Sequence, residues 1–234
     1  MQLPLPYCFT KQSVSADSKS DGKLTMDLTI VYFVRHGETA ANLTNTVQGQ
    51  LDYPLDDAGL RQADAVAERL KDMKFDVIYS SDLSRAAATA EKISGGRKVI
   101  KDPALREWML GDWQTRTIQD IKKLYPEEYR KFTNDDPDFV PSGGESSAGF
   151  RRRAADFLKK VHAECSGRTV LCVSHGGFIK QILKCVMGVE TFGITPKCEN
   201  TSVSAFATSD GVRWQLLFWN DHSHLEHFTS SSGW

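Results

Sequence analysis

Two histidine–glycine pairs stand where apolar runs of the sequence give way to glycine turns. The first run, Ile30 to Asn42 (IVYFVRHGETAAN), places Arg35 and His36 at this point, and the second, Val170 to Gly177 (VLCVSHGG), places His175 there. Strand ends of this kind present side chains to a ligand in an α/β sheet, and the free backbone N–H groups beside them suit an anion. The two histidine-bearing ends therefore predict one phosphate pocket.

The elements that must position these residues follow an alternating pattern from Leu28 onward. Apolar strands alternate with segments of helical periodicity, which is typical of a parallel sheet covered by helices on both faces. Because Asp210-Gly211 is a hairpin signal, the last two strands are predicted to be antiparallel. The predicted fold class is thus a doubly wound, mostly parallel α/β sheet flanked by helices, with an antiparallel C-terminal edge. The predicted strands are Leu28–Val34, Phe75–Tyr79, Thr169–Ser174, Val203–Thr208 and Val212–Trp219.

Helical periodicity and capping residues predict the helices between these strands. The predicted helices are one capped by Asp57 and reaching Leu70, one capped by Asp82 and reaching about Ile93, one capped by Ser146 and running through Val161, and the segments Thr117–Leu124, Pro126–Phe132 and Phe178–Met187. Arg151 to Arg153, on the polar side of the helix after Ser146, are predicted to face solvent.

Length and composition favour one globular unit. At 234 residues with 40% hydrophobic content the chain can bury a full core, and no Gly/Pro-rich linker divides it. We therefore expect one domain over residues 28–234, preceded by a flexible arm over residues 1–27. The arm has no apolar run long enough for a signal peptide or a membrane span. The formal net charge of -1 argues against nucleic acid as a partner, so any positive site must be local.

The five cysteines of the chain show neither CxxC spacing nor clustering with histidine. This odd set fits a reduced cytosolic compartment, so we expect a cytoplasmic protein. Cys172, in a predicted strand, and Cys185, in a predicted helix, are expected to be small buried hydrophobic residues. No cysteine is assigned a role in chemistry.

The order of several motifs makes the chain resemble the histidine phosphatase superfamily, also called the phosphoglycerate mutase-like family. The motifs are RHGETAAN from Arg35, QGQLDYPLDDAGLRQA from Gln48, SSDLSRAAATA from Ser80, PSGGES from Pro141 and VSHGG from Val173. The resemblance covers Leu28 to about Leu225. It implies a doubly wound sheet with the pocket at the carboxyl ends of its strands.

The resemblance makes His36 the nucleophile, which forms a phosphohistidine that water later hydrolyses. A histidine can attack phosphorus only if one ring nitrogen is unprotonated, so the other N–H needs a fixed acceptor, which the Gly37 carbonyl can supply. Phosphoryl transfer also needs cations around its charged transition state. Four residues match those that bind the transferring phosphoryl group in the family: Arg35, Arg85, His175 and Asn42.

A leaving alkoxide needs a proton, and the family supplies it from a glutamate in an L-x-E segment, where this chain has Glu107. Asp112 and Glu145 stay open as alternatives. Thr39 is expected to contact phosphate, and Glu38 to order the turn after the nucleophile. Further residues expected to bind substrate are Gln48, Gly49 and Gly176.

No metal or other cofactor is expected. His222, His224 and His227 look superficially like metal ligands, but no other ligand cluster accompanies them in the sequence. The NDHSHL segment that carries two of them resembles the tail that closes the fold in family phosphatases.

The resemblance implies hydrolysis of small phosphate monoesters, such as phosphorylated sugars or sugar acids. Glycolytic mutases of the family carry a longer insertion and an ERHYGGL-like segment, whereas this chain has REWMLGDW and a compact span to PSGGES. This departure favours a phosphatase over a phosphoglycerate mutase. The chain has all the residues expected for catalysis, His36, Arg35, Arg85, Glu107 and His175. This argues against a pseudoenzyme that only binds a phospholigand or a protein.

The expected partner is a small phosphorylated metabolite, with no nucleic acid and no membrane, and the protein is expected to be a monomer or homodimer. Four basic residues of the variable middle could bind a second phosphate or carboxylate of the substrate. The basic residues of the variable middle are expected to form a charged solvent face instead. They are Lys122, Lys123, Arg130 and Lys131.

Overall fold

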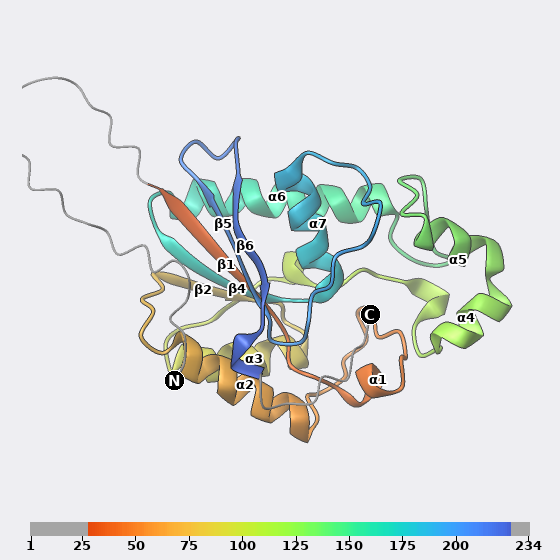
Figure 1. The fold of residues 1–234 in the computed structure, drawn as a ribbon, viewed down its shortest axis with the longest axis horizontal. Coiled ribbons are helices and arrows are strands. Elements are labelled where there is room, and N and C mark those ends of the chain that lie inside the picture. The colour runs from red at the N-terminus through yellow and green to blue at the C-terminus, as the bar shows by residue number, and fades with distance from the viewer. Residues whose placement is uncertain (1–27, 226–234) are drawn as a thin grey trace, which may run out of the picture.

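The computed structural model describes residues 28–225, so the predicted arm at 1–27 and His227 lie outside the described residues. The strands of this part are β1 (Thr29–Arg35), β2 (Val77–Ser80), β3 (Ile100–Lys101), β4 (Thr169–Ser174), β5 (Val203–Thr208) and β6 (Gln215–Asp221). They form one sheet in the order β3-β2-β4-β1-β5-β6 (Figure 1). The pairs β1–β4, β2–β4 and β2–β3 are parallel, whereas β1–β5 and β5–β6 are antiparallel. The predicted sheet with its antiparallel C-terminal edge is confirmed.

Helices cover both faces of this sheet. They are α2 (Asp57–Leu70), α3 (Ser84–Ser94), α6 (Ser147–Cys165) and α7 (Gly176–Met187). Val31 and Phe33 of β1 pack in a core with residues of α6 and α7, whereas Tyr32 and Val34 pack with residues of α2 and α3. Figure 1 shows α6 and α7 above the sheet and α2 and α3 below it. This two-faced packing follows from the alternation of side chains along a strand and makes the sheet doubly wound.

A small aromatic core lies apart from the sheet, around α4 (Ile118–Leu124) and α5 (Pro126–Thr133). Its centre is Trp113, which has no exposed surface and whose indole N–H donates to Glu128 at 2.8 Å. Figure 1 shows both helices to one side of the main body, near the short α1 (Ala40–Leu43). The extension supplies one wall of the cavity described below.

The helix starts differ in part from the predicted ones. Ser146 caps α6 as predicted, accepting from the Gly149 N–H at 3.0 Å. The cap of α2 is Asp56 rather than Asp57, because the Asp56 carboxylate accepts from the Gly59 N–H at 2.7 Å.

The prediction that Asp82 caps α3 is wrong. The helix begins at Ser84 without a side-chain cap. The Asp82 carboxylate instead takes two hydrogen bonds from Arg106, at 2.6 and 2.7 Å. This bidentate pair ties the start of α3 to the segment that carries Glu107.

The predicted burial of two cysteines holds fully for one of them. Cys172 is fully buried in β4 as predicted, whereas Cys185 on α7 is only partly buried. Within residues 28–225, no helix combines the length and apolar character that crossing a membrane requires.

Candidate active site

His36 directly follows β1 and is almost completely buried. Its ring Nδ1 lies 2.7 Å from the Gly37 carbonyl oxygen, the acceptor predicted for it. Because a carbonyl only accepts, Nδ1 carries the proton and Nε2 of the neutral ring is free to attack. Burial holds the pKa of His36 well below its usual value, and the charges of Arg85 and Arg35 lower it further. The ring is therefore neutral at neutral pH.

The sheet register brings His175 beside His36. Parallel pairing of β1 with β4 sets Arg35 opposite Ser174, so each histidine follows a neighbouring strand end. The two ring centroids are 5.1 Å apart. His175 Nε2 lies 2.9 Å from the Ser81 hydroxyl, whereas its buried Nδ1 has no hydrogen-bond partner among the described residues. A hydroxyl that donates to Nε2 would leave the Nδ1 proton for a phosphate oxygen.

Two arginines bring unpaired donors to the same place. The Arg35 guanidinium donates to the Cys198 carbonyl at 2.6 Å, and the Arg85 guanidinium donates to the carbonyls of Leu51 and Gly49 at 2.8 Å each. In the part of the chain described, the buried Nε atoms of both arginines lack a partner. Burial lowers the pKa of Arg85 to about 10, so the side chain stays charged at neutral pH. Buried, charged and incompletely bonded guanidinium groups suit an anion.

Asn200 and Thr201 hold the nucleophile segment in place from the turn before β5. The Asn200 amide donates to the His36 carbonyl at 2.9 Å, and the Thr201 N–H donates to the Arg35 carbonyl at 3.0 Å. Sequence reasoning missed both residues. Their only sequence signal is that they precede a predicted strand.

Glu107 follows a short 3-10 turn after β3, and both of its carboxylate oxygens accept backbone bonds. Oε2 accepts from the Gly177 N–H at 3.0 Å, and Oε1 accepts from the Trp108 N–H at 2.9 Å. A Cβ on residue 177 would lie 2.3 Å from Oε1, so glycine is required there for this approach. The contact joins the L-x-E segment to the first turn of α7.

Arg153 fixes the backbone of this segment, so the prediction that Arg151 to Arg153 all face solvent is wrong for this residue. Its guanidinium donates to the carbonyls of Arg106 and Glu107 at 2.6 and 3.1 Å. It also forms an ion pair with Glu145 at 2.7 Å. One arginine on the inner side of α6 therefore orders the loop that presents Glu107.

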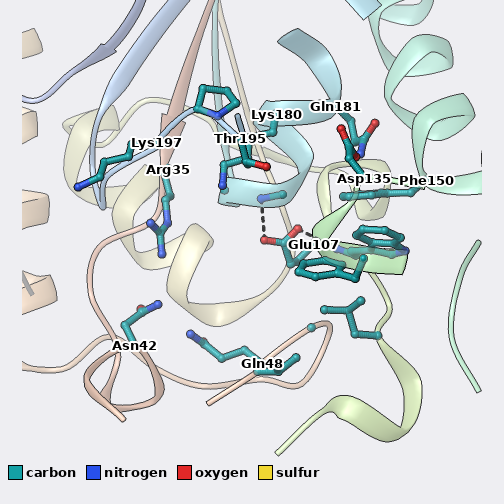
Figure 2. Close-up of a pocket in the computed structure, with 18 of the residues that line it drawn as sticks. Arg35, Asn42, Gln48, Glu107, Asp135, Phe150, Lys180, Gln181, Thr195 and Lys197 are labelled. Atoms are coloured by element: carbon teal, nitrogen blue, oxygen red, sulfur yellow. Dashed lines mark hydrogen bonds between the residues drawn. The ribbon is translucent and has the colours of Figure 1, made fainter. Parts of the chain in front are cut away.

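A cavity of about 520 Å³ joins most of these groups. The predicted residues that line it are Arg35, His36, Asn42, Gln48, Gly49, Arg85, Glu107 and Gly176. Figure 2 shows Arg35, Asn42 and Gln48 around one side of the pocket and Glu107 across from them. The remaining predicted residues, His175 and Thr39, are fully buried and are not among those that line the cavity.

Thr39 and Glu38 order the turn beside the nucleophile. The Thr39 N–H and hydroxyl donate to Asn42 Oδ1 at 3.1 and 3.0 Å, which leaves the Asn42 amide N–H groups for the cavity. The Glu38 N–H donates to Gln62 at 2.9 Å, and the Glu38 carbonyl accepts from Asp56 at 3.1 Å. Both bonds are made by the backbone of Glu38, so the ordering role of its side chain stays a prediction.

The two alternatives to Glu107 lie elsewhere. Glu145 is paired with Arg153, and neither Glu145 nor Asp112 lines the cavity. Asp112 instead accepts a bond from Arg116 through its backbone carbonyl, at 2.7 Å. Of the three carboxylates considered, Glu107 is the one placed at the cavity.

The cavity extends beyond the predicted set to a wall that the sequence did not indicate. This wall includes aromatic residues, and it includes polar residues from α7 and the loop after it. They are Trp108, Tyr129, Phe132, Phe150, Lys180, Gln181, Lys184, Phe192, Thr195 and Lys197. Lys180, Gln181 and Lys184 share one face of α7 after VSHGG, a helical spacing that could have indicated them.

Two of the C-terminal histidines that superficially resemble metal ligands contact other groups. His224 Nε2 lies 3.0 Å from the Thr201 hydroxyl, and burial lowers the pKa of His224 to about 4. His222 Nδ1 lies 2.8 Å from the Asn220 carbonyl. Over residues 28–225, no group of three or more histidine, cysteine, aspartate and glutamate side chains is arranged to hold a metal ion.

Comparisons with known proteins agree with this geometry. The Phosphoglycerate mutase-like protein 4 of Arabidopsis thaliana is 39% identical over 206 residues, which cover 86% of this chain and 89% of that protein. The Metal-independent phosphoserine phosphatase of the same plant is 35% identical over 210 residues, covering 88% and 87%. A mutant phosphoserine phosphatase of Entamoeba histolytica in complex with phosphoserine superposes with a TM-score of 0.78 at 31% identity, covering 84% of this chain and 99% of that one.

The family model for the histidine phosphatase superfamily (branch 1) matches residues 31–222. This range contains both histidine-bearing strand ends and the Glu107 segment. The family predicted from the motifs is confirmed, and the chain belongs to branch 1 of the histidine phosphatase superfamily.

Proposed function

We propose that this protein is a phosphoric monoester hydrolase that acts on small phosphate monoesters through a phosphohistidine on His36. One observation carries the proposal: the unprotonated Nε2 of a buried, neutral His36 shares a cavity with unpaired arginine donors and a glutamate. The phosphatase names of its relatives support the reaction class.

In the first step, His36 Nε2 attacks phosphorus while the bond from phosphorus to the ester oxygen breaks. Arg35, Arg85 and the Nδ1 side of His175 hold the equatorial oxygens, where the transition state carries its charge. Asn42, whose Oδ1 is occupied by Thr39, donates through its amide nitrogen. The arginine and His175 contacts use buried nitrogens that have no hydrogen-bond partner among the described residues.

In the second step, water attacks the phosphohistidine and releases inorganic phosphate and neutral His36. We assign Glu107 the proton transfers of both steps. It protonates the leaving alkoxide first and then accepts the proton of the attacking water, so the enzyme returns to its starting state.

Glu107→Gln is expected to slow alkyl phosphates roughly 10²-fold or more, and nitrophenyl phosphate much less. The reason is that an alkoxide needs the proton whereas nitrophenolate leaves without it. Steady-state rates on both substrates test this, with Asp112→Asn as a control outside the cavity. Equal losses on both substrates would contradict the role of Glu107 as the acid.

We further propose that the reaction is hydrolysis rather than isomerisation, needs no metal and takes place in the cytoplasm in a single domain of residues 28–234. Arg35 and Arg85 supply the charge that a metal would otherwise bring. Four described cysteines are free, which is consistent with a reducing compartment.

The test supplies 3-phosphoglycerate in the presence of a chelator and follows inorganic phosphate and 2-phosphoglycerate together. Phosphate release that chelator does not change is the expected result. Isomerisation that outruns phosphate release would establish a phosphoglycerate mutase. Binding without either product would establish a pseudoenzyme.

A further inference from the structure

His224 is a titratable residue next to the nucleophile segment that the proposed reaction does not use. It lies in a short 3-10 turn, η3 (Ser223–Leu225), which follows β6. Its Nε2 lies 3.0 Å from the Thr201 hydroxyl, a contact that joins η3 to the turn before β5. Burial and the charge of Arg69 lower the pKa of His224 to about 4, so the ring is neutral at neutral pH. The contact with Thr201 is therefore a hydrogen bond between uncharged groups.

Thr201 has a backbone conformation that a β-branched residue rarely adopts. Its φ of 53° lies in the left-handed region, and the residue is fully buried. Such a conformation costs free energy and persists only where the surrounding contacts impose it. In this conformation the Thr201 N–H donates to the Arg35 carbonyl at 3.0 Å and to the His36 carbonyl at 3.3 Å. The placement of both carbonyls therefore depends on the contacts that hold Thr201.

The support on which His224 stands is anchored to the body of the fold. Asp221, the last residue of β6, forms an ion pair with Arg69 of α2 at 2.5 Å, and both side chains are mostly buried. The other oxygen of Asp221 accepts from the Ser223 N–H and hydroxyl at 3.1 and 2.8 Å. In Figure 1 the blue turn after β6 lies against α2. His224 thus connects a fixed part of the structure to Thr201.

We infer that His224 is a positioning residue for His36 and that it acts through the Thr201 hydroxyl. His224 holds Thr201 in its left-handed conformation, and the Thr201 N–H then holds the backbone of the nucleophile segment. The attacking nitrogen must line up with phosphorus, and a misplacement of about 1 Å can cost about a hundredfold in rate. Because Asn200 also bonds the His36 carbonyl, loss of the hydroxyl bond should slow the transfer rather than abolish it. This inference rests on the proposed function because it takes His36 as the attacking group.

The test removes the hydroxyl bond from either side. Thr201→Val keeps the shape of the side chain but has no hydroxyl, and His224→Leu has no ring nitrogen. Each change should slow the nitrophenolate burst from nitrophenyl phosphate, which follows phosphoenzyme formation, by about ten- to a hundred-fold. The Kd of nitrophenyl phosphate, measured by calorimetry in a His36→Ala background, should stay unchanged. Thr201→Ser keeps the hydroxyl and should retain the wild-type burst rate.

A double variant shows whether the two residues act through one contact. Because one bond can be lost only once, Thr201→Val combined with His224→Leu should be no slower than either single variant. Additive losses, a wild-type rate in Thr201→Val, or an equal loss in Thr201→Ser would overturn the inference. His222→Leu removes an exposed histidine of the same segment and is the matched control, with a wild-type rate expected. If His224→Leu does not fold, the Thr201→Val and Thr201→Ser pair decides the question.

NMR of nitrogen-labelled histidine separates this inference from the proposed function, because it reports the tautomer of His36 without turnover. The wild-type ring should carry its proton on Nδ1, where it bonds the Gly37 carbonyl. Thr201→Val should show a mixture of tautomers as this bond loosens. If the wild-type protein forms no phosphoenzyme, the proposed function is overturned and the tautomer decides the inference. A mixture in Thr201→Val would then support the positioning role, and an unchanged Nδ1 tautomer would overturn it.

Discussion

Replacing His36 with alanine should abolish the phosphoenzyme and lower turnover by roughly four orders of magnitude or more, as for other residues that form covalent intermediates. The expectation follows from the ring geometry, because the bond to the Gly37 carbonyl fixes the proton on Nδ1 and leaves Nε2 as the attacking atom. Brief incubation with a labelled phosphoester followed by quenching should give an acid-labile, alkali-stable label on the wild-type protein and none on the His36→Ala variant.

His175→Ala is the control for this experiment. His175 lies beside the nucleophile, with ring centroids 5.1 Å apart, but its free Nδ1 is suited to hold phosphate rather than to attack. This variant should still become labelled, at a reduced rate. Normal labelling of His36→Ala would show that another residue is the nucleophile.

The acid side of the pH profile gives a second check on His36. Its pKa is lowered well below the usual value by burial and by Arg85 and Arg35, so the ring becomes protonated only at lower pH than an exposed histidine. As pH falls, kcat/KM should therefore show no loss from protonation of His36 at pH 6.5. It should decline only at lower pH, where the ring takes up a proton. An acid limb assigned to His36 at or above that pH would contradict the buried, neutral state.

The strand ends that position the nucleophile could be predicted from the sequence because local pattern determines them. An apolar run that stops at a histidine and a glycine marks both the strand and its end, and Thr169–Ser174 has the predicted bounds in the structure. Parallel pairing then brings Arg35 opposite Ser174 without any information beyond strand order. Motif order added Arg85 and Glu107, which lie far apart in sequence but line one cavity.

The residues that sequence reasoning missed or misread depend on tertiary partners. Arg151 to Arg153 look alike in sequence, yet Arg153 turns inward to the carbonyls around Glu107. Asp82 has the residue type of a helix cap, but a bidentate bond to Arg106 competes for its carboxylate. Neither partner can be known before α6 and the segment after β3 are packed together.

The far wall of the cavity illustrates the same limit. Lys184 and Lys180 are one turn apart on a predicted amphipathic helix and have the same chemical type. Asp135, which follows α5, forms an ion pair with Lys184, whereas none is made by Lys180 among the described residues. Which of the two lysines is paired therefore depends on a contact between distant segments.

Arg85→Lys should lower kcat/KM by about ten- to a hundred-fold, because losing one charged hydrogen bond costs roughly 1.5–3 kcal/mol. Lysine keeps the positive charge but offers a single ammonium group in place of a planar fork. The native guanidinium bonds the carbonyls of Gly49 and Leu51 at 2.8 Å each and still has a buried Nε without a partner among the described residues. A lysine places all three of its N–H donors on one atom, so it does not span the two carbonyls and the phosphoryl oxygens as the planar guanidinium does.

Two comparisons show whether this loss comes from the phosphoryl group. Arg152→Lys changes an exposed arginine on α6 and should leave the rate unchanged. Vanadate, which takes the geometry of the transferring group, should bind the Arg85→Lys variant more weakly by the same factor as the loss in kcat/KM. That equality is expected only if Arg85 acts on the transition state. Wild-type turnover in the variant would mean that Arg85 serves only to brace the loop at Gly49 and Leu51.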